Sequence, residues 1–149
     1  MTEDKKTSLG PTGHRLRANV TRLRTALGMS KKDLSDRVGE LGRPIPPLGI
    51  TRLEAGTRRV DADDLIALSV ALGVNPSTLL LPFTDEADEE VEITAIGWME
   101  ADRAWDWLDG AAPAERIEPG DPQGRLLRWE YYARPAGRRM QFGPAGEGD

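Results

Sequence analysis

The sequence has no cysteine and a single histidine, His14. Without thiols there is no disulfide, no thiolate nucleophile and no cysteine-based zinc site. One imidazole leaves no histidine cluster for a transition metal. No apolar run approaches the roughly 18–20 residues that a membrane span requires, and Met1 to Gly10 is polar and lacks the apolar core of a signal peptide. We therefore expect a cytoplasmic protein without metal or cofactor.

Sequence motifs of catalysis are missing as well. The chain contains no glycine-rich phosphate loop, no serine-centred nucleophile motif and no histidine–cysteine pair. Neighbouring carboxylates such as Asp63 and Asp64 lie at a predicted helix start, where they need no catalytic role. The arrangement of nucleophile, base and oxyanion donors that an active site requires is not evident. We expect that the protein is not an enzyme.

The charge that is present is unevenly distributed along the chain. The 149 residues carry a net charge of −5, yet residues 1–60 hold 13 Lys and Arg against 6 Asp and Glu. Residues 61–149 hold 7 basic residues against 19 acidic ones. A basic N-terminal part is the expected footprint of a surface that binds a polyanion such as nucleic acid. Two solvated faces of opposite sign would produce the same counts.

Apolar residues at helical spacing predict five short helices within residues 12–82. Ser30 with Asp33, and Asp61 with Asp64, predict capping boxes at two helix starts, and Pro46-Pro47 predicts the start of the third helix at residues 46–54. Gly28 follows the first apolar stripe and predicts the end of the first helix. The expected core stripes are Leu16, Val20, Leu23 and Leu27; Leu34, Val38 and Leu41; and Leu65, Leu68 and Leu72, widened by Ile66 and Val70.

Composition divides the rest of the chain. Residues 1–11 are polar and predict a disordered tail, and residues 83–90 form an acidic linker. Residues 91–142 contain all four tryptophans and begin as an alternating strand at Val91, followed by a short helix over 101–108. Residues 126–133 are apolar and aromatic, a pattern that fits a strand or a helix. Residues 143–149 are expected to be a second tail.

Segment 16–82 resembles the helix-turn-helix domain of phage repressors, the Cro/cI-like or XRE-type family. The resemblance implies a mainly α fold with a five-helix domain over residues 12–82, and the pattern of residues 91–142 predicts a small Trp-rich α+β extension after it. Between the second and third helices, residues 39–47 contain about five residues more than the tight turn of this family. The resemblance rests on an ordered series of residues: Leu23-Arg24, Leu27-Gly28-Met29-Ser30, Leu34, Ile50, Leu53-Glu54-Ala55-Gly56, Leu65-Ile66-Ala67-Leu68, Ala71-Leu72-Gly73-Val74 and Leu79-Leu80.

The resemblance also implies which residues face DNA, because the third helix of such domains enters the major groove. It assigns base contacts to Pro47, Leu48 and Arg52, and only Arg52 can bond bidentately to guanine. The same resemblance pairs Glu54 with Arg24 in a structural ion pair. The implied phosphate contacts are Lys31, Arg43, Thr51, Arg58 and Arg59, although each of these also fits a solvated surface residue.

These expectations describe a sequence-specific double-stranded DNA-binding transcription regulator, with a repressor at a palindromic operator as the leading hypothesis. It would lie in the cytoplasm, at the nucleoid when bound to DNA. Residues 91–142 are expected to promote homodimerisation or to sense a small-molecule effector, although large side chains also serve to fill a small core. The alternative is an adaptor or antitoxin-like protein whose Trp-rich part binds a protein partner. The expected partner or dimer interface contains Trp98, Trp105, Trp107 and Trp129.

Overall fold

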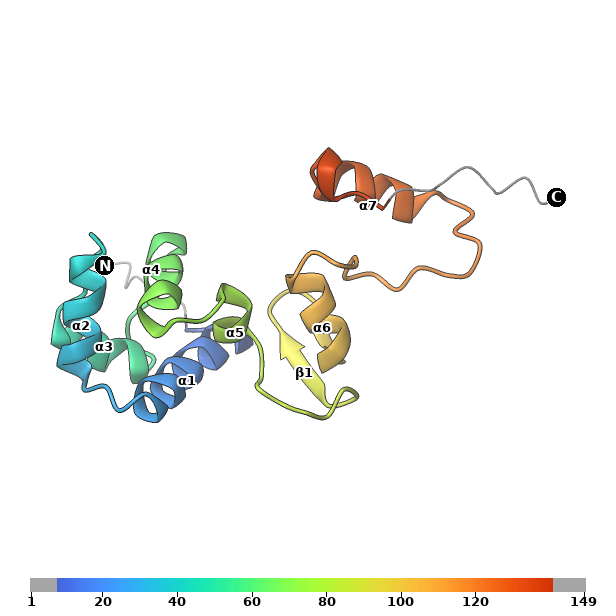
Figure 1. Cartoon of the computed structure of the whole chain (residues 1–149). Coiled ribbons are helices and arrows are strands. Elements are labelled where there is room, and N and C mark those ends of the chain that lie inside the picture. Colours follow the sequence, from blue (N-terminus) through green and yellow to red (C-terminus); the bar gives the residue numbers. More distant parts are fainter. Residues whose placement is uncertain (1–7, 141–149) are drawn as a thin grey trace, which may run out of the picture. The chain divides into compact units, whose positions relative to one another are not determined.

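A computed structural model describes residues 8–140 of the chain. This part of the chain belongs to two compact units, a first unit that ends at Trp105 and a second unit that begins at Asp106. Helices provide most of the regular structure (Figure 1). Residues 1–7 of the expected N-terminal tail, and the whole expected C-terminal tail, lie outside the described residues. The division expected at residues 83–90 stays a prediction.

Five helices build the greater part of the first unit (Figure 1). They are α1 (Pro11–Ala26), α2 (Lys31–Glu40), α3 (Pro47–Glu54), α4 (Ala62–Leu72) and α5 (Pro76–Leu80). Both predicted capping boxes form, at Ser30 and at Asp61. Pro47 is the first residue of α3, as predicted, since the missing N–H of proline costs no helical hydrogen bond there. The starts of α2, α3 and α4 are therefore set by local chemistry.

Side chains from all five helices share one hydrophobic core. Val20 on α1, Leu34 on α2, Ile50 on α3 and Leu68 on α4 are completely buried within it. Burial of a side chain of this size stabilises the fold by about 1.5–3 kcal/mol. The buried Asn19 Nδ2 donates to the backbone oxygens of Leu79 at 3.0 Å and of Leu81 at 2.8 Å, so the end of α5 is tied to α1.

Four apolar residues expected in the core are exposed instead. Leu27 and Leu41 are the C-cap residues of α1 and α2, where the chain leaves the helical path and its side chains leave the buried stripe. Ile66 and Val70 lie four residues apart on α4, on the side away from the buried Ala67, Leu68, Ala71 and Leu72. The expectation that these four residues belong to the core was therefore wrong.

The lengthened connection between α2 and α3 forms an ordered loop over residues 41–46. Gly42 takes a positive φ of 84°, which lets the chain reverse after α2. Ile45 returns to the core and is 1% exposed. Ser35 Oγ donates to the Ile45 backbone oxygen at 2.6 Å, so α2 holds the end of the loop next to α3.

A two-stranded antiparallel hairpin completes the first unit. Strands β1 (Glu90–Ile93) and β2 (Gly97–Glu100) pair Val91 with Met99 and Glu92 with Trp98. Val91 and Met99 are buried, whereas Trp98 points outward. The alternation starting at Val91 predicted the first strand, but no pattern in the sequence had predicted the second.

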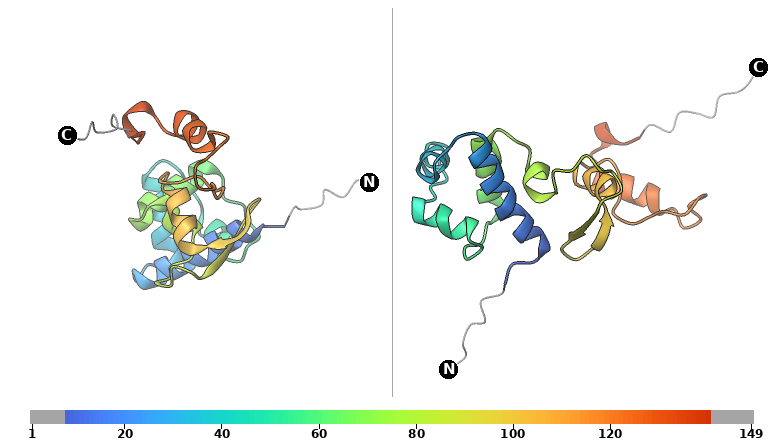
Figure 2. Two further views of the ribbon diagram at one scale, coloured as in Figure 1. Left: turned by 90° about the vertical axis from the view of Figure 1, so that its right-hand side faces the viewer. Right: turned by 90° about the horizontal axis from the view of Figure 1, so that it is seen from below.

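The hairpin docks on the N-terminal end of α1 (Figure 2). Thr12 N donates to Thr94 Oγ1 at 3.3 Å, and Thr94 N donates to Thr12 Oγ1 at 3.0 Å. Gly10, the N-cap of α1, has no side chain with which to accept a backbone N–H. Thr94 therefore provides from 82 residues away the acceptor that a capping side chain normally provides.

The second unit contains α7 (Arg125–Ala133) and a short 3₁₀ helix η1 (Ala136–Arg138), and helix α6 (Ala101–Leu108) crosses the boundary between the units. The structure thus makes residues 126–133 helical. Buried Glu130 accepts from Arg134 Nη1 at 2.9 Å and from Met140 N at 3.1 Å. Arg139 donates to the backbone oxygens of Glu130, Tyr131 and Arg134, which closes the C-terminal end of α7.

Candidate nucleic-acid interface

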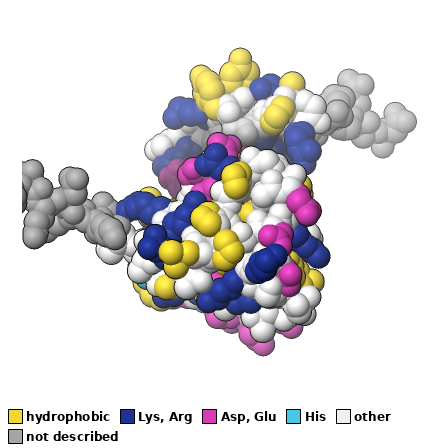
Figure 3. Space-filling view, turned by 90° about the vertical axis from the view of Figure 1, so that its left-hand side faces the viewer, with side chains coloured by type: hydrophobic (Ala, Val, Ile, Leu, Met, Phe, Trp, Pro, Cys, Tyr) yellow, Lys and Arg dark blue, Asp and Glu magenta, His cyan; other side chains and the backbone are white. Residues whose placement is uncertain are grey.

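Helix α3 has one buried and one exposed face. Gly49, Ile50 and Leu53 are buried. The exposed face holds Pro47 and Leu48 and, one turn further on, Thr51 and Arg52, and Leu48 is 57% exposed. Figure 3 shows Lys and Arg side chains interspersed with hydrophobic ones on the face that holds α2 and α3. The three predicted base contacts thus lie together on one accessible surface.

Close packing at the start of α3 fixes the position of this helix. A Cβ atom at Gly49 would lie 2.9 Å from Ile45 Cγ2, closer than real Cβ contacts allow. The absence of a side chain at Gly49 lets α3 approach the loop that precedes it. The first turn of α3 is therefore packed against a residue anchored in the core.

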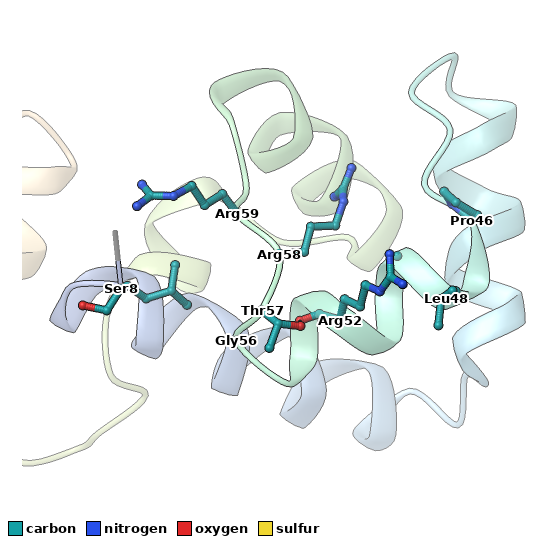
Figure 4. A pocket seen from close by; sticks show the side chains of 10 residues that line it. Ser8, Pro46, Leu48, Arg52, Gly56, Thr57, Arg58 and Arg59 are labelled. Carbon is teal, nitrogen blue, oxygen red and sulfur yellow. The ribbon is translucent and has the colours of Figure 1, made fainter. Parts of the chain in front are cut away.

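Three arginines surround a hollow beside α3. Arg52 comes from the helix itself, while Arg58 and Arg59 come from the chain that follows it (Figure 4). The hollow has a volume of about 750 Å³, and Leu48 and Leu9 add apolar surface to it. Guanidinium groups bind guanine edges or phosphates bidentately, and an apolar side chain fits a thymine methyl. Sequence reasoning missed Leu9 and Ser8, since both fall within the expected tail.

Two further predicted phosphate contacts lie on accessible parts of α2 and α3. Lys31 is the first residue of α2 and is half-buried. Thr51 is exposed, and its Oγ1 donates to the Pro47 backbone oxygen at 3.2 Å. The Thr51 hydroxyl proton is therefore used within the helix. The hydroxyl oxygen can still accept a hydrogen bond. Lys31 keeps its positive charge available to an anion.

Arg43, also predicted to contact phosphate, is instead bound to two carboxylates. Its Nη2 lies 2.5 Å from Asp61 Oδ2, and its Nε lies 2.9 Å from Asp64 Oδ1. The hydrogen bond with Asp64 raises the pKa of Arg43, with the charge of Asp61 as the next contribution. In the DNA-free protein Arg43 thus serves the fold, and Arg58 Nη1 approaches the same Asp64 carboxylate at 3.5 Å.

The structure brings Arg24 and Glu54 together as an ion pair. Arg24 Nε donates to Glu54 Oε1 at 2.5 Å and Arg24 Nη2 donates to Glu54 Oε2 at 3.0 Å, a bidentate geometry. The Glu54 side chain is 8% exposed. Its negative charge at the end of α3 is therefore neutralised and shielded from an approaching polyanion.

The four tryptophans differ in their exposure. Trp98 is 66% exposed on β2, whereas Trp105 and Trp107 on α6 and Trp129 on α7 are half-buried. The Arg134 guanidinium lies 5.7 Å from the centre of the Trp129 ring. Of the four, Trp98 is thus the residue most open to a partner.

Neither a metal centre nor a membrane span is found within residues 8–140. No group of three or more His, Asp or Glu side chains in this range is placed to hold a metal ion. No helix in the same range is both long enough and apolar enough to cross a membrane.

Comparison with known families agrees with this geometry. Residues 20–79 match the model of a helix-turn-helix family. No curated protein and no solved structure matches the chain. The matched segment begins within α1 and ends within α5, so it covers the helices that present α3. The chain carries an XRE-type helix-turn-helix domain of the Cro/cI-like kind, and this domain is characteristic of DNA-binding transcription regulators.

Proposed function

We propose that the protein is a sequence-specific repressor of transcription that inserts α3 into the major groove of a palindromic operator. The observation that carries the proposal is the exposed face of α3, where Pro47, Leu48 and Arg52 stand beside the arginines of the following chain. Arg52 would bond bidentately to guanine, a contact worth about 1–3 kcal/mol of discrimination. Pro47 and Leu48 would contact a thymine methyl or fit the groove wall.

Backbone contacts would hold this helix in register. Lys31 and Arg59 provide two cations for phosphates, and the Thr51 hydroxyl would contact the backbone beside them. Arg58, like Arg43, lies against the carboxylate of Asp64. A homodimer would then use four cations, so the logarithm of the binding constant should fall with the logarithm of salt concentration at a slope of about −4. Salt dependence thus reports how many of these residues bind DNA.

A homodimer is part of the proposal, because repressors of this kind bind two half-sites about 34 Å apart. Residues 91–142 are the segment that we assign to dimerisation or to sensing an effector. Trp98 supports this role, since an exposed tryptophan on a sheet is typical of an interface. The hairpin that holds Trp98 is docked on α1, so a partner bound there would be rigidly connected to the DNA-binding helices.

The decisive experiment is the selection of bound sequences from a random duplex pool, with wild type beside Arg52→Ala. We expect wild type to enrich a palindrome, and Arg52→Ala to lose the preference for one guanine in each half-site. Arg15→Ala is the matched control, because Arg15 is exposed on α1 and does not line the hollow. Failure of wild type to enrich any sequence would refute the proposal.

A second function, that of an adaptor or antitoxin-like protein, is favoured by the same exposed Trp98. In that case a protein partner would cover the hairpin, and the surface around Arg52 would be dispensable. Light scattering of wild type and Trp98→Ala would separate the two uses of the tryptophan. If Trp98→Ala converts a dimer into a monomer, Trp98 serves self-association. If the molecular mass is unchanged, Trp98 is available to bind another protein.

A further inference from the structure

The chain on either side of α3 contacts one buried carboxylate. Arg43 lies in the loop before α3 and Arg58 lies in the segment after it. Arg43 Nε donates to Asp64 Oδ1 at 2.9 Å, and Arg58 Nη1 approaches Asp64 Oδ2 at 3.5 Å. The Asp64 side chain is 5% exposed. One residue of α4 therefore holds both flanks of the helix that faces DNA.

Asp64 is itself held firmly at the start of α4. Its backbone N–H donates to Asp61 Oδ1 at 2.8 Å, and its Oδ2 accepts from the Asp61 backbone N–H at 3.4 Å. Asp61 also binds Arg43 Nη2 at 2.5 Å. Both oxygens of the buried carboxylate are thus in use, and the capping box of α4 is continuous with the ion pairs to the two flanks.

The lengthened loop explains why such an anchor is needed. A tight turn fixes the angle between two helices through its own backbone, whereas a loop with Gly42 and several more residues does not. Arg43 is the side chain through which this longer loop reaches α4. From these contacts we infer that Asp64 is a positioning residue, which orients α3 for base recognition by binding the arginines on its two sides.

This inference rests on the proposed function, and it makes a prediction that loss of stability alone does not. Asp64→Asn removes the charge that binds Arg43 and Arg58, so Arg58 loses its ion pair with Asp64 and Arg43 keeps only its ion pair with the exposed Asp61. We expect affinity for the selected operator to fall about tenfold, the loss of one good base contact. Affinity for unrelated DNA should hold or rise, with a steeper salt slope, because freed cations bind phosphate. Simple unfolding would lower both affinities together.

Asp63→Asn is the matched control. Asp63 precedes Asp64 in the first turn of α4 and is exposed, and none of the ion pairs to the flanks of α3 involves it. This variant removes the same charge from the same helix end, so operator affinity should stay within about twofold of wild type, the change expected of an exposed charge. A tenfold loss in both variants would overturn the inference, because it would assign the effect to charge at α4 and not to the anchor.

A second measurement keeps the test independent of DNA recognition. In the DNA-free protein, amide hydrogen exchange in residues 41–46 and 55–60 should speed up in Asp64→Asn and in Arg43→Ala, while exchange in α5 should not change. Arg43→Lys should restore part of the protection. If wild type binds no preferred sequence, the proposed function fails while faster exchange still supports the anchor. Unchanged exchange in both flanks would overturn the anchor even if wild type binds an operator.

Discussion

Replacing Arg24 by alanine should destabilise the helix-turn-helix domain by about 3 kcal/mol. The Arg24 and Glu54 side chains are 14% and 8% exposed, and their bidentate contact joins α1 to the end of α3. Arg24 Nη1 also donates to the Met29 backbone oxygen at 2.9 Å. Removing one partner of a buried pair costs about 3–5 kcal/mol, since the other charge is left without a partner. Water reaches part of Arg24, so the lower end applies.

Denaturation followed by far-ultraviolet circular dichroism is the appropriate assay. All four tryptophans lie outside the five helices, so their fluorescence would report on other parts of the chain. For a domain of this size a loss of about 3 kcal/mol corresponds to a fall in melting temperature of about 12 °C or more. An Arg24→Ala variant that melts within about 2 °C of wild type would refute the reasoning, because the pair would then contribute no more than a surface contact.

A double-mutant cycle isolates the pair from the other contacts of Arg24. Glu54→Ala alone leaves a buried guanidinium, whereas the double variant leaves no unpaired charge. We expect a coupling energy of about 1–3 kcal/mol between the two positions. Lys32 and Asp36 form the matched surface pair, at 2.8 Å on α2, and Lys32→Ala should leave the melting temperature nearly unchanged.

Two further predictions concern the ends of α2 and α1. Hydrogen bonds from the Ser30 backbone N–H and hydroxyl hold the pKa of Asp33 below its usual 3.8, so the stability it contributes is complete at neutral pH. This contribution is lost as the pH falls through the lowered pKa, and Asp33→Asn should remove that part of the acid dependence of unfolding; an unchanged pH profile would contradict the cap. Thr94→Val removes the acceptor of the Thr12 N–H, and we expect a loss of about 1 kcal/mol with faster amide exchange at Thr12. Exchange equal to wild type would mean that the hairpin does not cap α1.

The starts of α2, α3 and α4 could be predicted because their causes are local. A capping box needs two residues three apart, and Pro47 needs only its own ring to favour the first turn of a helix. The predicted starts at Ser30, Asp61 and Pro47 accordingly agree with the structure. The same reasoning found α6 over residues 101–108, where the strand pattern ends and helix-forming residues follow.

Features that depend on distant contacts could not be predicted in this way. A stripe of leucines continues in the sequence through Leu27 and Leu41, but periodicity does not show where the backbone leaves the helix. β2 is bounded by Gly97 and holds only four residues, too few for alternation to stand out. The docking of Thr94 on Thr12 joins residues that are 82 positions apart. It follows from the tertiary fold and not from the local sequence around either residue.

The basic N-terminal part of the chain, residues 1–60, offers DNA less charge than its composition suggests. Among its 13 Lys and Arg, Arg24 is neutralised by Glu54, Arg43 is bound by Asp61 and Asp64, and Arg58 lies against Asp64. Counting residues could not reveal this, because the arginines that bind carboxylates and those beside α3 have the same chemistry. The salt slope can distinguish them. Four cations in a dimer give a slope of about −4, and the addition of Arg43 and Arg58 from each subunit would give about −7. The steeper value would mean that both arginines leave their carboxylates when DNA binds, and that the anchor at Asp64 opens in the complex.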